Sequence, residues 1–486
     1  MLTAHACYLK ETDMNTEKQT VRVRFAPSPT GYLHIGSFRT ALFNWLFARH
    51  HKGVFLVRIE DTDIERSKPE YTEAIADALQ WINIQADEPV VIQSDRTPEH
   101  NALIEQLLAE GKAYKDFYTE EEFTELYTAK FGITEFPKAH RICRGQPQDQ
   151  DKPYVVRFKL PLDRQDVCFD DVIRDTVCID IQQLDDFVLS RSGARPMYNF
   201  VVVADDIHQR VTHVIRGEDH IPNTPKQILL YEALGAKPPV FAHLPLILGK
   251  SGNRLSKRDA ATSVMEYEQA GYLPDALLNY LVRLGWAHGD QEVFTRAELI
   301  DCFSLEAIGK KGSIFDQDKL DWLNGLYMRN SDDKALYTIM HEIKPDILQI
   351  IKKDEQELLK WIALYKERAH TVAQLADMII AAHAAPATYD TEACAKWTDA
   401  QTANDVQELI KRFETVTTLG VAEVKAIVEQ YAKDAGKKLG NIAQLIRIAL
   451  VGSSSSPSVF ELVTLLGKSE SIARLKAFAL YLTSRA

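Results

Sequence analysis

The segment that decides the fold covers residues 21–36 and reads Val21-Arg-Val-Arg-Phe-Ala-Pro-Ser-Pro-Thr-Gly31-Tyr-Leu-His-Ile-Gly36. Its first five residues alternate apolar and basic side chains, which is typical of a β-strand. Two prolines and Gly31 then predict a turn. The next apolar residues recur at three- and four-residue spacing and predict an amphipathic helix: Phe38, Ala41, Leu42, Trp45 and Leu46.

A second strand follows this helix. Gly53 ends the helix, and Val54 to Ile59 is a run of residues that favours a strand. A strand, a helix and a strand within about 40 residues form a right-handed βαβ unit, which is the start of a parallel sheet. We therefore expect an α/β fold for the N-terminal half of the chain.

The stretch 97–192 has a different pattern and is interpreted as an insertion into this fold. A charged helix is predicted near residues 120–130, a polar loop at 145–152, and strands at 154–160 and 177–181.

The parallel-sheet pattern resumes after the insertion. Strands are predicted at 199–204 and 211–215, and a helix at 225–234. Beyond about Ala270 the pattern predicts helices and no further strands.

Composition narrows the class of protein. The chain has 486 residues, a formal net charge of −12, 45% hydrophobic and 26% charged residues, which is typical of a globular protein and excludes wholesale disorder. No apolar run approaches the roughly 18 residues that span a membrane. The start of the chain lacks the apolar core of a signal peptide, and Met14 is an alternative start to Met1. We expect a soluble protein with no membrane partner.

The cysteines indicate a reducing compartment. None of the six stands in a C-x-x-C pair, and their spacing does not resemble a secreted disulfide framework. A cytoplasmic protein is expected, with these thiols as ordinary small buried side chains. The six are Cys7, Cys143, Cys168, Cys178, Cys302 and Cys394.

The turn in the opening segment is a candidate phosphate site. Backbone N–H groups at a helix N-terminus favour a phosphate, Gly31 and Gly36 allow a nucleotide to approach closely, and His34 can donate to phosphate oxygens. The alternative is a tight turn with a histidine that only caps the helix.

A basic segment, Gly252-Asn-Arg254-Leu-Ser256-Lys257-Arg258, is a second candidate. It places three cations within five residues of a predicted loop. Such a loop can act as a mobile clamp that supplies positive charge to a triphosphate. The alternative is an ordinary solvated basic loop.

Together the two segments resemble the HIGH and KMSKS signatures of class I aminoacyl-tRNA synthetases. Their surroundings narrow the resemblance to the glutamyl-tRNA synthetases, and it extends from about Val21 to the C-terminus. The motifs that carry it stand in the order of that family: residues 24–31 (RFAPSPTG), 58–63 (RIEDTD), 216–220 (RGEDH), 254–258 (RLSKR), 437–440 (KKLG) and 447–457.

The resemblance implies a fold class and a division of the chain. We expect an α/β fold: a Rossmann-type parallel-sheet catalytic domain with an α+β insertion, followed by an all-α anticodon-binding half. The implied parts are an N-terminal extension predicted to be disordered (1–20), the catalytic domain (21–96 and 193–253), an insertion that binds the acceptor end (97–192), the KMSKS loop with a helical connecting domain (254–330), and a helical anticodon-binding domain (331–486).

The implied activity is that of a glutamate–tRNA ligase. The α-carboxylate of L-glutamate attacks the α-phosphate of ATP to give glutamyl-adenylate and pyrophosphate, and the terminal ribose of tRNA(Glu) then takes the glutamyl group. Such chemistry depends on positioning and charge neutralisation more than on a covalent nucleophile. Mg²⁺ should arrive with ATP, held mainly by phosphates and water. A monomer fits the family.

The resemblance also implies roles for individual residues. His34, Lys257 and Arg258 are the candidate catalytic residues, and the ATP site is expected to comprise Gly31, His34, Gly36, Arg254, Ser256 and Lys257. The glutamate site is expected to comprise Arg24, Ala26, Ser28, Glu60, Tyr198 and Arg216. A guanidinium suits the substrate's side-chain carboxylate because it binds in a fork, and Glu60 suits the ammonium.

Each of these roles has a structural alternative. Arg24 and Glu60 could pair with each other, and Tyr198 could belong to the core. Asp61 and Asp63 are expected to cap or bridge structure rather than hold a metal.

Three departures from the family pattern stand out. Ser37 replaces the last histidine of the first signature, and Arg254 replaces the first lysine of the second; glutamate enzymes tolerate both. Many relatives also begin a zinc site with a C-x-C pair in the insertion, where this chain has Asp116 and Tyr118. Because Cys143 alone cannot make such a site, we predict no zinc.

The tRNA contacts are predicted from basic residues of the helical half. Lys433, Lys437, Lys438 and Arg447 form a local basic stripe suited to phosphates, or else a solvated helix face. Whether tRNA(Gln) is charged as well stays open.

Other functions compete with the ligase as interpretations, among them a truncated tRNA-modifying relative, which is disfavoured because such proteins lack the last ~150 residues that this chain has. A glutaminyl enzyme is disfavoured by the helical C-terminal half. A small-substrate nucleotidyltransferase would not need that half, and a catalytically silent binding protein would not need His34 and Lys257.

Overall fold

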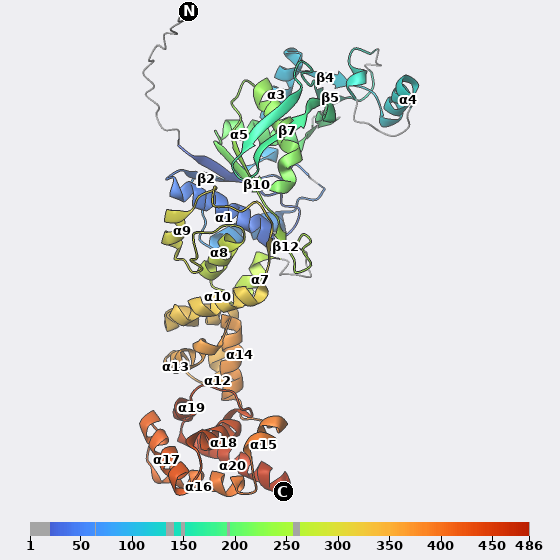
Figure 1. Ribbon diagram of the computed structural model, residues 1–486. Coiled ribbons are helices and arrows are strands. Elements are labelled where there is room, and N and C mark those ends of the chain that lie inside the picture. Colours follow the sequence, from blue (N-terminus) through green and yellow to red (C-terminus); the bar gives the residue numbers. More distant parts are fainter. Residues whose placement is uncertain are drawn as a thin grey trace, which may run out of the picture. The chain divides into compact units, whose positions relative to one another are not determined.

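The computed structural model describes residues 20–63, 65–132, 140–146, 151–191, 195–255 and 263–485. Contacts within the chain divide it into two compact units (Figure 1). The first unit comprises the chain up to Val264 together with Leu278–Phe315, and the second comprises Met265–Leu277 and the chain from Asp316 onward. The predicted N-terminal extension lies outside the described residues except for Thr20. The domain boundaries drawn from the sequence stay predictions.

The first unit begins with the predicted βαβ unit. β1 (Arg22–Phe25) and β2 (Val54–Ile59) are parallel, and α1 (Ile35–His50) connects them. The short strand β3 (Val91–Ile92) extends the sheet in parallel beside β2. Eleven residues of α1 are buried, so the helix is a core element rather than a surface one. The prediction of a strand, a helix and a strand at the start of a parallel sheet is confirmed.

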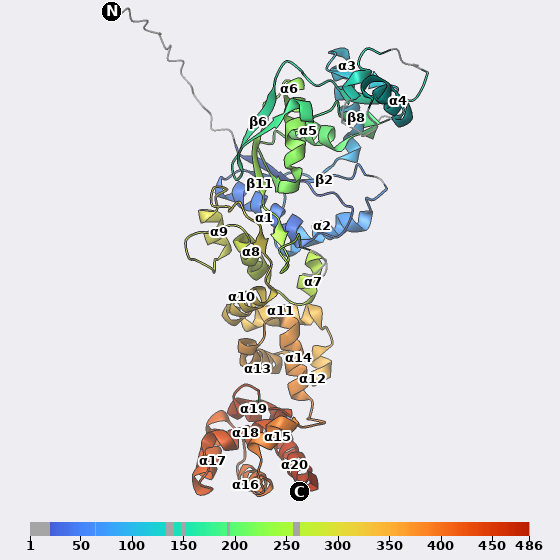
Figure 2. The ribbon, with the colours of Figure 1, turned by 45° about the vertical axis from the view of Figure 1, so that its right-hand side comes forward.

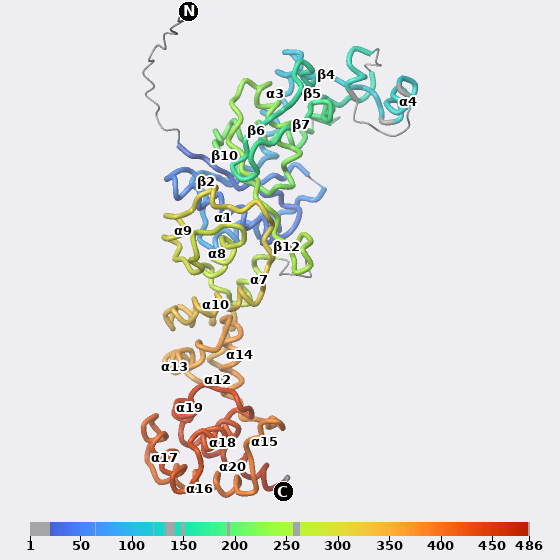
Figure 3. The backbone as a smooth tube through the Cα atoms, in the orientation of Figure 1, coloured from blue at the N-terminus to red at the C-terminus, as the bar shows by residue number. Residues whose placement is uncertain are grey.

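A second sheet lies next to β1 and has the order β10-β11-β6-β7. β10 (His213–Gly217), β11 (Val240–Leu244) and β6 (Asp166–Asp171) are parallel neighbours, and β7 (Asp175–Asp180) is antiparallel to β6. The amide of Thr212, just before β10, donates to the carbonyl of Arg22 in β1 at 2.9 Å. The N-terminal strands and β10 therefore lie together, as the blue and green traces of Figure 3 show.

One predicted strand is wrong. Residues 199–204 belong to helix α5 (Tyr198–His208). The run of three valines favours a strand by propensity, but this helix buries every residue from Phe200 to Asp206. Tertiary burial overrides the β-branched preference here. Two aspartates at the end of the apolar run were the sign that a β-strand did not fit.

The remaining elements of the first unit cover and extend the two sheets. The insertion carries an antiparallel sheet with the order β4-β5-β8-β9. The elements are α2 (Pro69–Trp81), η1 (Ser94–Arg96), α3 (Thr97–Ala109), β4 (Ala113–Asp116), α4 (Glu120–Phe131), η2 (His140–Cys143), β5 (Val155–Phe158), η3 (Ile181–Gln183), β8 (Val188–Arg191), β9 (Arg195–Pro196), η4 (Glu218–Asn223), α6 (Thr224–Ala233), β12 (Ile247–Leu248), α9 (Arg296–Cys302) and β13 (Ser313–Ile314). All but the first residue of α7 (Val264–Gln269) belongs to the second unit, and α8 (Pro274–Arg283) has residues in both.

The expectation that no strand follows Ala270 is wrong. β13 is a two-residue strand that pairs in parallel with β12, Ile247 opposite Ser313. So short a strand has too few residues to show the alternation by which a strand is recognised.

The cysteine prediction is also wrong for one pair. Cys168 in β6 and Cys178 in β7 stand directly opposite each other and form a disulfide, with their Cα atoms 4.1 Å apart. Ten residues separate them in sequence, and only the register of the hairpin shows that they meet. Cys143 and Cys394 are buried thiols as expected, whereas Cys302 is half-buried. Cys7 lies outside the described residues.

The second unit is helical throughout its described residues. It has one large apolar core, in which α16 packs against α20 and α17 against α19 (Figure 2). The helices are α10 (Gln317–Asn330), α11 (Asp333–Ile343), α12 (Ile347–Ile351), α13 (Glu355–Tyr365), η5 (Lys366–Arg368), α14 (Val372–His383), α15 (Thr391–Trp397), α16 (Thr402–Thr415), α17 (Val421–Asp434), α18 (Leu439–Val451), α19 (Val459–Leu466) and α20 (Lys468–Arg485). Over the described part of the chain, no helix combines the length and apolarity that a membrane crossing requires.

Candidate active site

A cavity of about 1000 Å³ opens in the first unit where several parallel strands end. Arg24 stands near the end of β1, Glu60 directly after β2, and Arg216 near the end of β10. Ligands in α/β proteins bind at the carboxyl ends of parallel strands. Every described residue predicted for the ATP and glutamate sites lines this one cavity: Arg24, Ala26, Ser28, Gly31, His34, Gly36, Glu60, Tyr198, Arg216 and Arg254.

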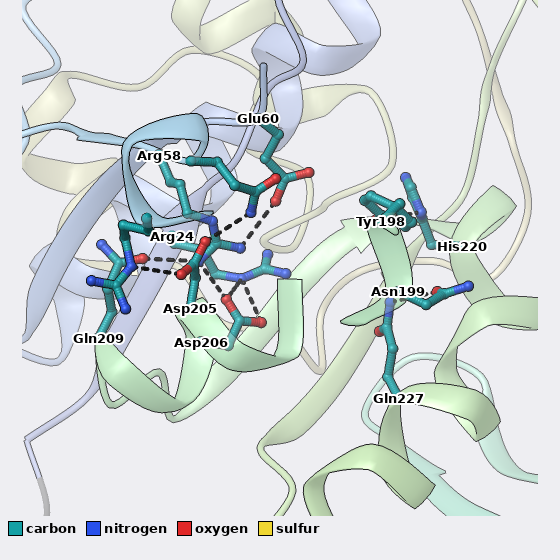
Figure 4. A network of polar contacts seen from close by, with 12 residues as sticks. Arg24, Arg58, Glu60, Tyr198, Asn199, Asp205, Asp206, Gln209, His220 and Gln227 are labelled. Carbon is teal, nitrogen blue, oxygen red and sulfur yellow. Dashed lines mark hydrogen bonds and ion pairs between the residues drawn. The ribbon is translucent and has the colours of Figure 1, made fainter. Parts of the chain in front are cut away.

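Arg24 and Glu60 each have a partner of their own rather than each other (Figure 4). Nε of Arg24 donates to both carboxylate oxygens of Asp206 at 3.2 and 3.3 Å. Arg58 donates to Asp206 at 2.7 Å and to Oε1 of Glu60 at 3.0 Å. The side chain of Gln209 accepts another bond from Arg58 at 2.8 Å. One buried carboxylate thus anchors two buried arginines, and the second arginine holds Glu60.

This network leaves polar atoms free at the cavity. Among the described residues, Nη1 and Nη2 of Arg24 and Oε2 of Glu60 make no hydrogen bond, although both side chains are buried. Burial raises the pKa of Glu60, against the opposing effect of Arg58 and Arg24. For Asp206, burial acts in the same direction, but Arg24 and Arg58 outweigh it and lower the pKa of that carboxyl. Asp206 is therefore a buried, ionised carboxylate that holds Arg24 and Arg58 in place beside the cavity.

Arg216 is held from one side only. Its Nε lies 3.2 Å from Nε2 of His243, and its Nη2 donates to Oγ1 of Thr224 at 2.7 Å. Its Nη1 is buried and has no partner among the described residues. Burial lowers the pKa of this guanidinium. A buried donor without an acceptor costs free energy, so Nη1 is ready for an anion in the cavity.

Tyr198 begins α5, where it is half-buried, packs against the core of the first unit and also lines the cavity. Its hydroxyl lies 3.1 Å from Nδ1 of His220, and both side chains line the cavity (Figure 4). Burial raises the pKa of Tyr198 to about 12 and lowers that of His220 to about 4. Both groups are therefore neutral at neutral pH and can only contribute hydrogen bonds.

The other end of the cavity is formed by the first turn of α1. Nδ1 of His34 accepts from the amide of Ser37 at 3.4 Å, so this side chain caps the helix. A Cβ at Gly36 would stand 3.2 Å from the His34 ring, which explains glycine at that position, whereas nothing described lies within 4 Å of a Cβ at Gly31. Arg254 is exposed and 3.8 Å from Asp219. Burial and Arg254 lower the pKa of His34, so it offers a hydrogen bond rather than a charge. With the guanidinium of Arg254, this end of the cavity suits phosphate better than a metal ion.

The basic loop falls largely outside the described residues. Ser256, Lys257 and Arg258 are not described, so their role as a phosphate clamp stays a prediction. The expected structural roles of Asp61 and Asp63 are visible: Asp61 accepts from the amide and hydroxyl of Ser94, and Asp63 accepts from the amide of Arg66.

In the insertion, Asp116 takes part in an ion pair with Arg157, whose Nε donates to it at 2.5 Å. Cys143 is fully buried in a small cluster with Phe123 and Tyr127. No group of three or more His, Cys, Asp or Glu side chains suited to a metal occurs among the residues that the structure describes. The absence of zinc stays a prediction.

The four basic residues of the second unit divide into two kinds. Lys433 and Lys438 are exposed, and neither has an ion-pair partner within the described ranges. Lys437 forms ion pairs with Asp405 and Asp399, and Arg447 donates to Oγ of Ser456 at 2.9 Å.

Several residues that shape the cavity were not identified from the sequence. They contact the predicted binding residues and hold them in place: Asp206, Arg58, His220 and His243. For Asp206 a signal existed, since two acidic residues end an otherwise apolar helix. For His243 the sequence holds no comparable signal.

Comparisons with known proteins agree with this geometry. Residues 20–322 match the family described as "tRNA synthetases class I (E and Q), catalytic domain", and residues 335–479 match "Anticodon binding domain". The chain is 41% identical over 473 residues to the glutamate–tRNA ligase of Geobacter sulfurreducens, covering 95% of this chain and 99% of that protein. It is 42% identical to the glutamate–tRNA ligase of Thermodesulfovibrio yellowstonii, covering 94% and 98%.

A solved structure is similar as well. The crystal structure of a glutamate tRNA ligase from Elizabethkingia meningosepticum in complex with its amino acid matches with a TM-score of 0.86 and 33% identity, covering 95% of this chain and 99% of that one.

Proposed function

The chain belongs to the glutamate–tRNA ligases, within the class I tRNA synthetases of the glutamate and glutamine group, and from this premise we propose how its cavity carries out the reaction. Glutamate binds between Arg24, Arg216 and Glu60. The observation that carries this proposal is the set of unused polar atoms: two cations with free donors and one carboxylate with a free acceptor surround the same space. That set complements a small molecule with two carboxylates and one ammonium.

In the proposed arrangement, the arginines bind carboxylate and Glu60 binds the ammonium. Tyr198, Ser28 and the backbone at Ala26 add hydrogen bonds that fix orientation. A fork-shaped guanidinium binds a carboxylate with two parallel bonds, which gives direction as well as energy. The supporting bonds from Asp206 and Arg58 hold the binding groups before substrate arrives, so little ordering remains to be done on binding.

ATP is proposed to bind at the other end, over the first turn of α1. His34, Gly31, Gly36 and Arg254 face its phosphates, and Ser256, Lys257 and Arg258 close on the pyrophosphate side. The α-carboxylate oxygen of glutamate attacks the α-phosphorus, and the bond from that phosphorus to pyrophosphate breaks. Mg²⁺ is proposed to enter with ATP on its phosphate oxygens, since the donors at this end of the cavity suit anions.

The second step uses the tRNA. Its terminal ribose hydroxyl attacks the carbonyl carbon of glutamyl-adenylate, and AMP leaves. The second unit is proposed to bind the tRNA through exposed lysines such as Lys433 and Lys438. The match of residues 335–479 to an anticodon-binding domain weighs against a small-substrate nucleotidyltransferase.

The glutamate site is tested by Arg24→Ala. We expect the KM for glutamate to rise about tenfold to a hundredfold, because a substrate carboxylate loses a charged partner. The KM for ATP should change less than about twofold. Arg22→Ala is the matched control, because Arg22 is two residues earlier on the same strand, is not among the residues that line the cavity, and bonds to Glu88 and to the backbone carbonyl of Gln209. Assays should include tRNA. Equal changes in the two KM values would show that Arg24 does not belong to the glutamate site.

The tRNA specificity is tested by charging purified tRNA(Glu) and tRNA(Gln) side by side. We propose tRNA(Glu) as the substrate. Charging of tRNA(Glu) alone supports this, whereas substantial charging of tRNA(Gln) would instead show an enzyme that serves both tRNAs.

A further inference from the structure

The guanidinium of Arg216 is oriented by a histidine, His243, that belongs to none of the sequence motifs. The guanidinium is buried, and its Nε points at Nε2 of His243, 3.2 Å away. Thr224 accepts from Nη2 at 2.7 Å, which leaves Nη1 without a partner among the described residues. An arginine has several rotatable bonds, so the two acceptors decide where the free nitrogen points.

His243 can accept from Arg216 in only one tautomer. Its Nδ1 lies 2.6 Å from Oδ2 of Asp171. An ionised carboxylate only accepts, so Nδ1 carries the hydrogen and Nε2 presents its lone pair to Arg216. His243 is fully buried, and burial lowers its pKa despite Asp171, so it is neutral at neutral pH.

Asp171 is itself fixed by backbone donors. Its Oδ1 accepts from the amides of Ile173 and Arg174 at 2.9 Å each, and its Oδ2 accepts from the amide of His243 at 3.1 Å. Burial alone would raise the pKa of this carboxyl, but the bond from His243 and the backbone donors lower it. The aspartate therefore stays ionised and cannot turn away.

We propose that Asp171 and His243 are positioning residues for glutamate, which act by fixing the tautomer that turns Arg216 toward the cavity. This inference rests on the proposed role of Arg216 in binding glutamate. Neither residue touches the substrate. Asp171 is the last residue of β6, within the insertion that the sequence predicted. A strand of the insertion thus sets the direction of a binding group in the cavity.

The surroundings of His243 explain why the tautomer matters. The charged and titratable groups that face it are Asp171 from β6, Arg174 from the turn after β6, Arg216 from β10 and His220 from η4. In the other tautomer, or when protonated, Nε2 would carry a hydrogen, which can point to Oγ1 of Thr224 3.1 Å away, and Nε2 could no longer accept from the N–H of Arg216. The arginine would then lose one of its two acceptors and have to turn.

Asp171→Asn tests the proposal with almost no change of shape. The asparagine oxygen at the Oδ1 position can keep the bonds from the amides of Ile173 and Arg174, and it lies 3.3 Å from the amide of His243, which loses its bond to Oδ2. The NH₂ then donates to Nδ1 of His243 and forces the hydrogen onto Nε2. We expect the KM for glutamate to rise roughly tenfold or more, with the KM for ATP unchanged. Nitrogen-15 NMR of labelled histidine should show the exchange of tautomers. Asp170→Asn is the matched control, since Asp170 is exposed and its side chain accepts, within the described part of the chain, from Thr176 alone.

Two further variants separate positioning from packing. His243→Gln keeps an acceptor for Arg216, whereas His243→Met fills similar space without one. We expect the Gln variant to retain most of the glutamate affinity and the Met variant to lose it. If Asp171→Asn does not fold, this pair decides.

Arg216→Ala distinguishes the two ways in which the proposal can fail. If Arg216→Ala raises the KM for glutamate but Asp171→Asn matches Asp170→Asn, or if His243→Met binds glutamate as well as His243→Gln, Asp171 and His243 do not position it. If Arg216→Ala leaves that KM unchanged, the assignment of Arg216 to glutamate is itself wrong.

Discussion

Both units bury an arginine, and they use it in opposite ways. In the second unit, Arg474 is 2% exposed, and all three of its nitrogens donate. They reach Glu470 and the carbonyls of Ala382, His383 and Leu450, which end α14 and α18. In the first unit, Arg216 is 5% exposed and keeps Nη1 without a partner in the described chain. Burial of charge alone does not indicate function, but a buried donor left unpaired beside a cavity does.

The strongest test of this difference is Arg216→Ala. We expect kcat/KM for glutamate to fall by a factor of roughly 150 to 4000, because removing one partner of a buried charge pair costs about 3–5 kcal/mol, at about 1.4 kcal/mol per tenfold. Stability should not fall, since the free enzyme loses a buried cation that was only partly satisfied. The measurements are glutamate charging of tRNA and thermal unfolding. A large loss of melting temperature would mean that Arg216 is structural like Arg474.

Arg474→Met should do the reverse. The methionine keeps the apolar stem but leaves three buried carbonyls without a donor, which we expect to cost about 3 kcal/mol of unfolding free energy. The KM for glutamate should stay within about twofold of the unmodified enzyme's value, measured at a temperature where the variant is folded. Urea unfolding followed by circular dichroism measures the loss.

The control for this variant is Lys476→Met on the same helix. Lys476 is 56% exposed and pairs with Glu414 at the surface, so its loss should change stability by less than about 0.5 kcal/mol. If both substitutions have the same small effect, the carbonyl bonds of Arg474 do not stabilise the second unit.

The same difference explains what the sequence could predict. The βαβ unit was predictable because Val21–Phe25 shows local alternation, Val54–Ile59 is a run of strand-favouring residues, and the helix between them shows local periodicity. Residues 199–204 were mistaken for a strand because three valines favour one locally, while the burial that makes them helical comes from elements far away in sequence. The Cys168–Cys178 bond was missed for the same reason, since hairpin register is not a local property.

The site shows the same limit. Arg24, Glu60 and Arg216 stand in motifs that resemble a family, so their convergence on one cavity could be expected. Their partners were harder to identify. Asp206 is marked only by its place at the end of an apolar run, His243 by nothing, and their contacts span 182 and 27 residues of sequence. Sequence patterns therefore predict which groups meet the substrate better than which groups hold them in place.

The two units also differ in how they use a carboxylate, and this difference predicts how glutamate binding depends on pH. Asp405 in the second unit accepts from Tyr431 at 2.7 Å and pairs with Lys437, whereas Glu60 has a free oxygen at the cavity and a pKa raised by burial. Glu60 must be ionised to bind an ammonium, so glutamate affinity should fall as pH falls through that raised pKa. We expect the KM for glutamate to rise by up to about tenfold per pH unit on the acid side.

Glu60→Gln identifies the source of that dependence. The variant should bind glutamate weakly at every pH and show a flat acid side, because the amide does not titrate. An acid limb that persists in Glu60→Gln would assign the titration to another group, such as the substrate or the tRNA.

The smallest expected effects concern the lysines of the second unit, where the same distinction applies to phosphate binding. Lys433 is exposed and has no ion-pair partner in the described chain, whereas Lys437 is 26% exposed at its side chain and pairs with Asp405 and Asp399. Lys433→Ala should weaken tRNA binding about threefold and lower the slope of log K against log salt by about one. Filter binding at several salt concentrations measures this slope.

Lys437→Ala should leave the slope unchanged and instead lower stability, because its ammonium is already neutralised by two aspartates. If Lys437→Ala lowers the slope as much as Lys433→Ala, tRNA displaces those aspartates on binding, and an internal partner does not withdraw a cation from function.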